Sequence, residues 1–326
     1  MRMRISILLL ALVPVTLWAQ FAPAQDKPGT TAMHADSSAF VAWATGCTLE
    51  RGPMRIDKPE SGLASYGADS LALGVPGGTF DVVSLGDGGT ATLTFESPIC
   101  NGTGPDFAVF ENGFANAQNP DTWALELGFV EVSSDGVNFF RFPAVTNVQT
   151  ENQLENGGSI DPAQLHNFAS KYGAFYGTPF DLDEVEDNAL LDKNHVTHVR
   201  IVDVVGCIQP EYATYDSEGH PVNDPWLTPF ASSGFDLDAV GVIHDLAHND
   251  VPENGEEVVS LYPNPVTDRL IVKAENLQSV EVYNAVGQLV MKTVNEIVDL
   301  SALTDGIYLV RVVCESGMMT KRIVKQ

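Results

Sequence analysis

Two short segments of the sequence repeat the order Phe-Asp-Leu-Asp, and their carboxylates could bind a cation. The segments cover residues 180–183 and 235–238. In an extended strand, side chains two residues apart share a face, so each carboxylate pair would lie opposite its Phe and Leu. Ca²⁺ takes six to eight oxygens from carboxylates, amides and carbonyls. The candidate calcium ligands are Asp106, Glu111, Asn112, Asp181, Asp183, Asp236 and Asp238.

No motif of fixed spacing, such as an EF-hand loop, accompanies these candidate ligands. The alternative stays open that the carboxylates face water while the neighbouring Phe and Leu side chains fill a core. Calcium is therefore an expectation about a cofactor, and it needs the fold to bring the seven residues together.

Aromatic residues form a second candidate binding set. Trp123, Tyr176, Tyr215 and Trp226 lie in or beside stretches rich in Gly, Pro and Asn. Exposed aromatic faces suit stacking on a sugar ring, and nearby Asn, Asp and Glu could supply hydrogen bonds. Each ring could instead pack a long loop onto the body of the protein. Residues 143–198 and 207–233 are predicted to be long insertions, and such loops often carry function.

Catalysis has little support from motifs. The sequence has no Gly-x-Ser-x-Gly elbow, no His-Glu-x-x-His and no phosphate-binding glycine loop. Glu111, Glu126 and Glu131 could supply the two carboxylates of a glycosidase, although an acidic protein offers such pairs by chance. His244 and His248 are four residues apart, but a solvated linker is favoured there over a zinc site. A binding protein is therefore favoured over an enzyme.

The negative charge of the protein is concentrated in its middle. The chain has 326 residues and a formal net charge of −26. Residues 26–255 hold 34 Asp and Glu against 8 Lys and Arg, whereas residues 256–326 hold 9 against 7. A strongly negative surface repels nucleic acids and anionic membranes, so neither is expected as a partner. The negative charge could simply keep the protein soluble, or some of the carboxylates could converge on a cation.

Short alternating segments predict an all-β fold. Residues 90–95 and 198–203 alternate apolar with polar residues, residues 106–110 and 130–133 are similarly short and β-rich, and turn signals fall between these segments. Helical patterning is thin, with residues 162–172 as the best candidate. We expect one β-sandwich over residues 36–248, followed by a polar linker at 249–255.

The middle of the chain resembles a known group of sandwiches. Val-Glu-Val-Ser-Ser-Asp-Gly at 130–136, Val-Thr-His-Val-Arg-Ile at 196–201 and Gly-Phe-Asp-Leu-Asp-Ala-Val at 234–240 are similar to strands of discoidin-like and galactose-binding-like jelly rolls of bacterial cell-surface proteins. The resemblance runs through most of residues 70–243. It implies a jelly-roll-like β-sandwich and, in general terms, a structural Ca²⁺. It does not identify the ligand, because such folds host unrelated ligands on their loops.

The two ends of the chain predict export. Arg2 and Arg4 precede an apolar run at 5–13, the order of a secretory signal peptide, with cleavage expected after Ala19 and Ala24 as the alternative. Residues 256–326 contain Tyr-Pro-Asn-Pro at 262–265, Val-Tyr-Asn-Ala-Val-Gly-Gln at 282–288 and Gly-Ile-Tyr-Leu-Val-Arg-Val at 306–312. This segment resembles the type A C-terminal sorting domain of the type IX secretion system of Bacteroidetes, a small Ig-like sandwich.

Three cysteines precede the tail and one lies in it. Cys47, Cys100 and Cys207 would pass through an oxidising compartment, so one disulfide among them is expected, and Cys100 with Cys207 is preferred because both lie at expected strand ends. The pairing itself stays open.

Together these patterns predict a protein secreted across the outer membrane to the cell surface or the medium. Its expected partners are the type IX machinery and a ligand, with no transmembrane segment. A glycan is the favoured ligand. Three alternatives stay open: surface capture of another nutrient, such as a corrinoid, for an outer-membrane transporter; a secreted glycan hydrolase; and a structural adhesin.

Overall fold

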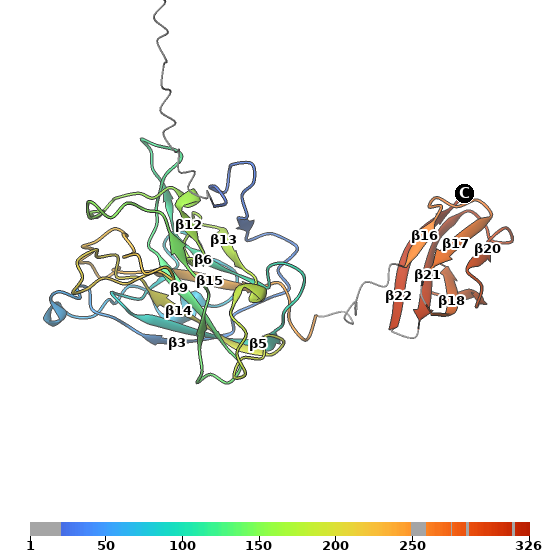
Figure 1. Cartoon of the computed structure of the whole chain (residues 1–326), viewed down its shortest axis with the longest axis horizontal. Helices are drawn as coiled ribbons and strands as arrows, with labels where there is room; N and C mark the ends of the chain where they lie inside the picture. The colour runs from blue at the N-terminus through green and yellow to red at the C-terminus, as the bar shows by residue number, and fades with distance from the viewer. Residues whose placement is uncertain (1–20, 249–258, 275, 285–286, 315–316) are drawn as a thin grey trace, which may run out of the picture. The chain divides into compact units, whose positions relative to one another are not determined.

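The protein consists of two compact units, residues 1–249 and 250–326 (Figure 1). The computed structural model describes residues 21–248, 259–274, 276–284, 287–314 and 317–326. The predicted signal peptide at 1–19 and the predicted linker at 249–255 lie outside the described residues. No helix in the described ranges is long and apolar enough to span a membrane.

The N-terminal unit is a sandwich of two antiparallel sheets. One sheet has the strand order β1-β13-β6-β15-β2, with β4 also paired to β15. Its strands are β1 (Met33–His34), β13 (Tyr176–Phe180), β6 (Phe107–Glu111), β15 (Asp236–Val242), β2 (Ala42–Trp43) and β4 (Val83–Ser84). The other sheet has the order β10-β9-β14-β5-β3. Its strands are β10 (Phe140–Arg141), β9 (Gly128–Ser133), β14 (Val196–Asp203), β5 (Thr90–Ile99) and β3 (Gly46–Glu50).

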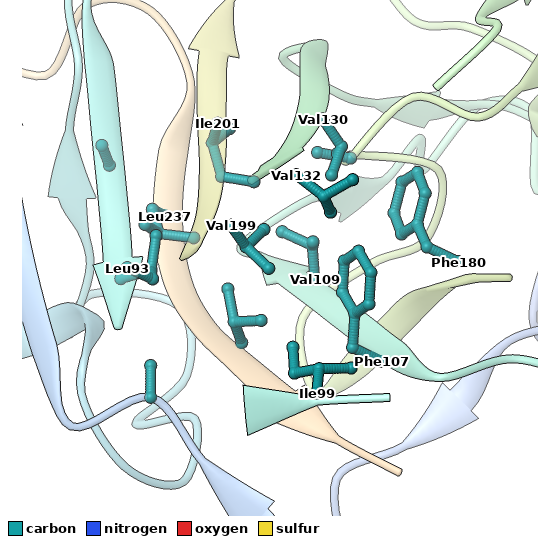
Figure 2. Close-up of a cluster of buried hydrophobic side chains, with 14 of the residues drawn as sticks. Leu93, Ile99, Phe107, Val109, Val130, Val132, Phe180, Val199, Ile201 and Leu237 are labelled. Carbon is teal, nitrogen blue, oxygen red and sulfur yellow. The ribbon is translucent and has the colours of Figure 1, made fainter. Parts of the chain in front are cut away.

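The core lies between these two sheets, and the predicted alternation explains why. Leu93 on β5, Val130 on β9 and Ile201 on β14 project from one sheet toward Val109 on β6 and Leu237 on β15 of the other (Figure 2). All five side chains are fully buried. Burial of apolar surface is worth roughly 25 cal/mol per Å², so this interior supplies the main stabilisation of the unit. The predicted all-β, jelly-roll-like sandwich is confirmed.

Two small hairpins and four 3₁₀ turns lie outside the two large sheets. They are β7 (Phe114–Ala115) with β8 (Trp123–Ala124), β11 (Val145–Thr146) with β12 (Leu165–His166), and the turns η1 (Pro59–Ser61), η2 (Asp69–Ala72), η3 (Pro162–Gln164) and η4 (Leu182–Glu184). The predicted helix at 162–172 is wrong. Only its first residues form a 3₁₀ turn, because Leu165 and His166 pair with β11 and Asn167 adopts a φ of 55°.

The folded unit begins before the predicted start at Asp36. Met33 and His34 pair with β13, and Ala24 is buried. Phe21 stacks on His166 at 5.1 Å between ring centroids. Phe21 is thus part of the packed unit, and the signal peptide and its cleavage site stay predictions.

The C-terminal unit is a second, smaller sandwich. A three-stranded sheet, β16-β17-β20, packs with a four-stranded sheet, β19-β18-β21-β22, around buried side chains such as Val272, Val282 and Val310. The strands are β16 (Ser260–Tyr262), β17 (Arg269–Lys273), β18 (Leu277–Asn284), β19 (Leu289–Thr293), β20 (Ile297–Asp299), β21 (Gly306–Cys314) and β22 (Gly317–Lys325). The predicted small sandwich is therefore confirmed.

The loop at 262–265 fastens the edge of the last strand. The Asn264 side chain donates to the carbonyl of Arg322 at 3.1 Å and accepts from the amide of Val324 at 2.9 Å. Val266 continues the contact through backbone hydrogen bonds with Val324 and Gln326. Asn264 of the Tyr-Pro-Asn-Pro motif thus bonds to backbone groups of β22, the edge strand of its sheet. These bonds protect part of the edge that no neighbouring strand covers.

Asn264→Ala is expected to loosen β22, because it removes two hydrogen bonds worth about 1 kcal/mol each. Amides of β22 should exchange with deuterium about fivefold or more faster, a factor that corresponds to about 1 kcal/mol. Hydrogen exchange of the full chain, read by mass spectrometry, measures this. Asn295→Ala is the matched control, since Asn295 is exposed and no side-chain hydrogen bond is seen for it. Equal exchange in the two variants would contradict the proposed role of Asn264.

The predicted disulfide is absent. Cys47, Cys100 and Cys207 all lie in the described part of the chain, and no disulfide bond joins any two of them. Cys100 and Cys207 are fully buried, and burial raises the pKa of both thiols. Cys100 directly follows β5, whereas Cys207 lies four residues beyond the end of β14 and packs with Val205 and Trp226.

Candidate functional site

Asp106, one of the predicted calcium ligands, closes turns at one end of the sandwich. Its Oδ1 accepts from the amide of Gly102 at 2.7 Å and lies 2.8 Å from Nδ1 of His244. Its Oδ2 accepts from the amide of Leu182 at 2.8 Å. Both oxygens of this buried carboxylate are therefore used within the protein.

The two Phe-Asp-Leu-Asp segments adopt different structures. Asp181 follows β13 and caps η4 by accepting from the amide of Asp183, so this pair is not on a strand. Asp236 and Asp238 are on β15, but a register shift interrupts the strand between Leu237 and Ala239. Asp238 accepts from the amides of Gly77 and Gly78 and is buried.

Glu111, Asn112 and Asp236 do come together. Glu111 ends β6 and Asp236 begins β15, and these neighbouring antiparallel strands bring the two ends to one edge of the sheet. Asn112 donates to Asp236 at 3.0 Å, and the Ser84 hydroxyl donates to the other oxygen of Asp236. Glu111 accepts from the amide of Gly113 and from Ser170 at 2.7 Å.

These three residues form one side of a pocket of about 240 Å³. Glu126, which follows β8, also lines the pocket, and the structure shows no hydrogen-bond partner for it among the described residues. Phe114 and Phe230 line it as well, and these rings are 49% and 50% exposed. Ala124 and Leu125 also line the pocket, and the rest of its wall comes from the two predicted insertions: Asn156, Gly157, Gly158, Pro225, Thr228 and Ser232.

Burial makes the pocket's carboxyl groups hard to ionise. Desolvation raises the pKa of Asp236 to about 6 and raises the pKa values of Glu111 and Glu126 well above their usual range. The negative charge of Asp236 pushes the pKa values of both glutamates further up. A carboxyl group with a raised pKa can act as a hydrogen-bond donor as well as an acceptor near neutral pH.

The predicted calcium ligands do not form one donor set. Asp106, Asp238 and the pair Asp181 and Asp183 are separated from the pocket and bond to backbone amides or, for Asp183, to Asn101. No group of three or more His, Cys, Asp or Glu in the described residues is arranged to hold a metal ion. Calcium needs six to eight converging oxygens, so it stays a prediction that these residues alone do not fulfil.

The predicted aromatic set is likewise dispersed. Trp226 is buried against Tyr212, and Trp123 packs in the cluster beneath the long loops. Tyr176 contacts His34 edge-on, whereas Tyr215 is 47% exposed. None of the four lines the pocket. Sequence reasoning missed Phe114 and Phe230, and the signal that could have found Phe114 is its place directly after Glu111-Asn112-Gly113 at the end of a buried strand.

Two other sequence candidates are structural. Glu131 is bonded to Arg141 at 2.8 Å and to Arg200 on the face of the second sheet, away from Glu111 and Glu126. His244 contacts Asp106 and His248 contacts Asp245, so the two histidines do not form a pair.

The chain is a two-part protein, in which a small C-terminal sandwich follows a larger sandwich that contains the pocket. A comparison with protein-family models identifies the C-terminal unit. Residues 260–326 match the model described as "Secretion system C-terminal sorting domain". The C-terminal unit is thus a type IX sorting domain, and the protein is secreted to the cell surface or the extracellular space.

The comparisons say less about the N-terminal unit. A search of curated proteins found no match. Among solved structures, the chain is similar to a candidate β-galactosidase from Bacteroides fragilis, with 12% identity and a TM-score of 0.19. The alignment covers 86% of this chain and 40% of that one, so the chain spans less than half of its length. At this TM-score the likeness supports no functional argument.

Proposed function

We propose that the N-terminal unit is an exported binding module that recognises a glycan in the pocket beside Phe114 and Phe230. The observation that carries this proposal is that two exposed aromatic rings and three carboxyl groups line the same pocket. Aromatic faces stack on the apolar face of a sugar ring, and carboxyl groups bond its hydroxyls. The aromatic rings and carboxyl groups of the pocket are therefore the groups that a sugar ring needs for binding.

The size of the pocket suits a single ring. Its volume of about 240 Å³ is below the ~300–1,000 Å³ of pockets that hold drug-sized ligands. A corrinoid is larger than such ligands and would have to lie mostly outside. The pocket thus favours one sugar residue, such as the end of a chain, over the corrinoid alternative.

Phe114→Ala and Phe230→Ala are each expected to weaken glycan binding about tenfold, because each removes a stacking surface worth roughly 0.5–1.5 kcal/mol. A glycan array followed by calorimetry with the best binder measures this. Tyr215→Ala is the control, since Tyr215 is exposed but does not line the pocket. Unchanged affinity in both Phe variants, or an equal loss in the Tyr215 variant, would place the binding elsewhere.

A glycan hydrolase is the second candidate, because Glu111 and Glu126 share the pocket and both have raised pKa values. Glycosidases need one carboxyl group that is protonated near neutral pH and a second that is ionised. The binding assay separates the two functions. Turnover of the bound glycan that Glu111→Gln abolishes without loss of binding would establish the enzyme, whereas binding without turnover supports the module.

A further inference from the structure

The pocket carries several acidic groups and no basic one. Glu111, Glu126 and Asp236 line it, and no Lys, Arg or His is among its lining residues in the described chain. The surroundings continue this trend, since the charges of Asp224 and Asp203 also act on Glu126. A pocket of one charge sign with apolar walls concentrates the electrostatic field on whatever enters it.

One of these three carboxyl groups differs from the other two in its hydrogen bonds. Asp236 has hydrogen bonds to both of its oxygens, and Glu111 has two donors. For Glu126, in contrast, no bond is seen within the described residues, although its side chain reaches the pocket.

Asp224 lies close to Glu126 and has one oxygen without a partner. It is 3% exposed, and its Oδ2 accepts from the amide of Leu127, the residue after Glu126. Its Oδ1 is buried with no hydrogen-bond partner. A buried polar atom without a partner is costly, so the Asp224 oxygen could accept a further hydrogen bond. Glu126 is half-buried and lines the pocket, whereas Asp224 does not line it, so Glu126 is the acceptor that a ligand can reach.

The aromatic rings point to the same kind of ligand. The faces of Phe114 and Phe230 carry partial negative charge and attract a cation within about 6 Å of the ring centre. A neutral hydroxyl satisfies one carboxyl group but gains little from the rings. A protonated amine donates up to three hydrogen bonds to carboxylates and is also attracted to aromatic faces. It is the group that meets both features of the lining.

We propose that the ligand of this pocket carries a protonated amine, as an amino sugar does, and that the ammonium group pairs with Glu126. This inference rests on the proposed function for the sugar part of the ligand, but the amine itself is assigned from the lining residues. An ammonium group beside Glu126 would favour the ionised carboxylate that burial disfavours, and a neutral sugar of the same shape would not.

Calorimetry of the full chain in EDTA tests the proposal with chitosan oligosaccharides, which carry amines, and chitin oligosaccharides, their neutral acetylated counterparts. We expect the amine series to bind at least tenfold more tightly, since a desolvated cation–carboxylate contact exceeds about 1.4 kcal/mol. Glu126→Gln should remove this preference and leave binding of the neutral series unchanged. Glu186→Gln, which changes an exposed carboxylate outside the pocket, should keep it.

The outcomes separate the amine from the glycan. Equal binding of both series would overturn the amine proposal and leave the glycan module standing. Binding of cadaverine, a diamine without a sugar, together with no binding of either oligosaccharide would support the amine and overturn the glycan. Binding that appears only when Ca²⁺ replaces EDTA would overturn the amine proposal, since a metal would then supply the positive charge.

Discussion

Asp106→Ala is expected to destabilise the N-terminal unit by about 3 kcal/mol or more. The substitution leaves the amides of Gly102 and Leu182 and the ring N–H of His244 without their acceptor. An orphaned buried donor such as the Leu182 amide costs about 1–3 kcal/mol, and the partly buried donors of Gly102 and His244 add to this cost. Asp183→Ala, which removes another predicted calcium ligand, should cost less than about 1 kcal/mol, because Asp183 is exposed.

Urea unfolding followed by tryptophan fluorescence measures both variants. All four Trp residues precede residue 249, so fluorescence reports on the N-terminal unit alone. Repeating the titration with Ca²⁺ and with EDTA distinguishes a metal ligand from a turn-closing carboxylate. If chelation of the wild type reproduced the loss seen in Asp106→Ala, Asp106 would be a calcium ligand after all.

Raising the pH from 5 to 8 is expected to lower the stability of the N-terminal unit. Desolvation raises the pKa of Asp87, Asp236 and Asp238 to about 6 each. In the unfolded chain an Asp has a pKa of about 3.9, so between these values the folded state holds more protons. The stabilisation is complete below about pH 4 and is lost as the pH rises through 6, because the buried groups must then ionise.

The size of this effect follows from the same pKa values. One unit of pKa difference corresponds to about 1.4 kcal/mol, so the three groups together can change the unfolding free energy by several kcal/mol. Groups of this unit with a lowered pKa, such as Asp57 and Glu184, stay ionised throughout this range and do not offset the effect. Their contribution is lost only at lower pH.

Urea midpoints at pH 5, 6, 7 and 8 at constant ionic strength give the pH dependence. Asp87→Asn keeps the shape of the side chain and cannot ionise, so its curve should be flatter than that of the wild type. Glu186→Gln, an exposed change, should follow the wild type. A midpoint that rises toward pH 8 would show that these carboxyl groups are stabilised as anions in the folded state.

Local patterns were sufficient to predict the sandwich. On β5 the alternation of Thr90, Ala91, Thr92 and Leu93 places Ala91 and Leu93 in the core, as expected from the period of a strand. The helix at 162–172 failed because periodicity in a short segment cannot register the pairing of Leu165 and His166 with a distant strand. Sequence patterns also could not show that residues 21–35 belong to the fold, since their partners lie on β13 and near Ala163.

The pocket was predicted only in part. Glu111, Asn112 and Asp236 were singled out as oxygen ligands and do meet, because they lie at adjoining ends of β6 and β15. Asp106 and Asp238 carry the same side chain but bond to backbone amides of loops whose paths the sequence does not specify. The exposed rings of Phe114 and Phe230 could not be distinguished from core residues by type, since most Phe side chains are buried.

The fastening of β22 by Asn264 and Val266 has a consequence for synthesis. The strand that completes the sorting sandwich is the last of the described chain to be translated, and its edge is held by residues made more than fifty positions earlier. A chain that stops short of β22 leaves β21 unpaired on that side and the 262–265 loop without its partner. Such a fragment lacks the strand that closes the four-stranded sheet of the sorting domain, so the fold of this domain requires translation through β22.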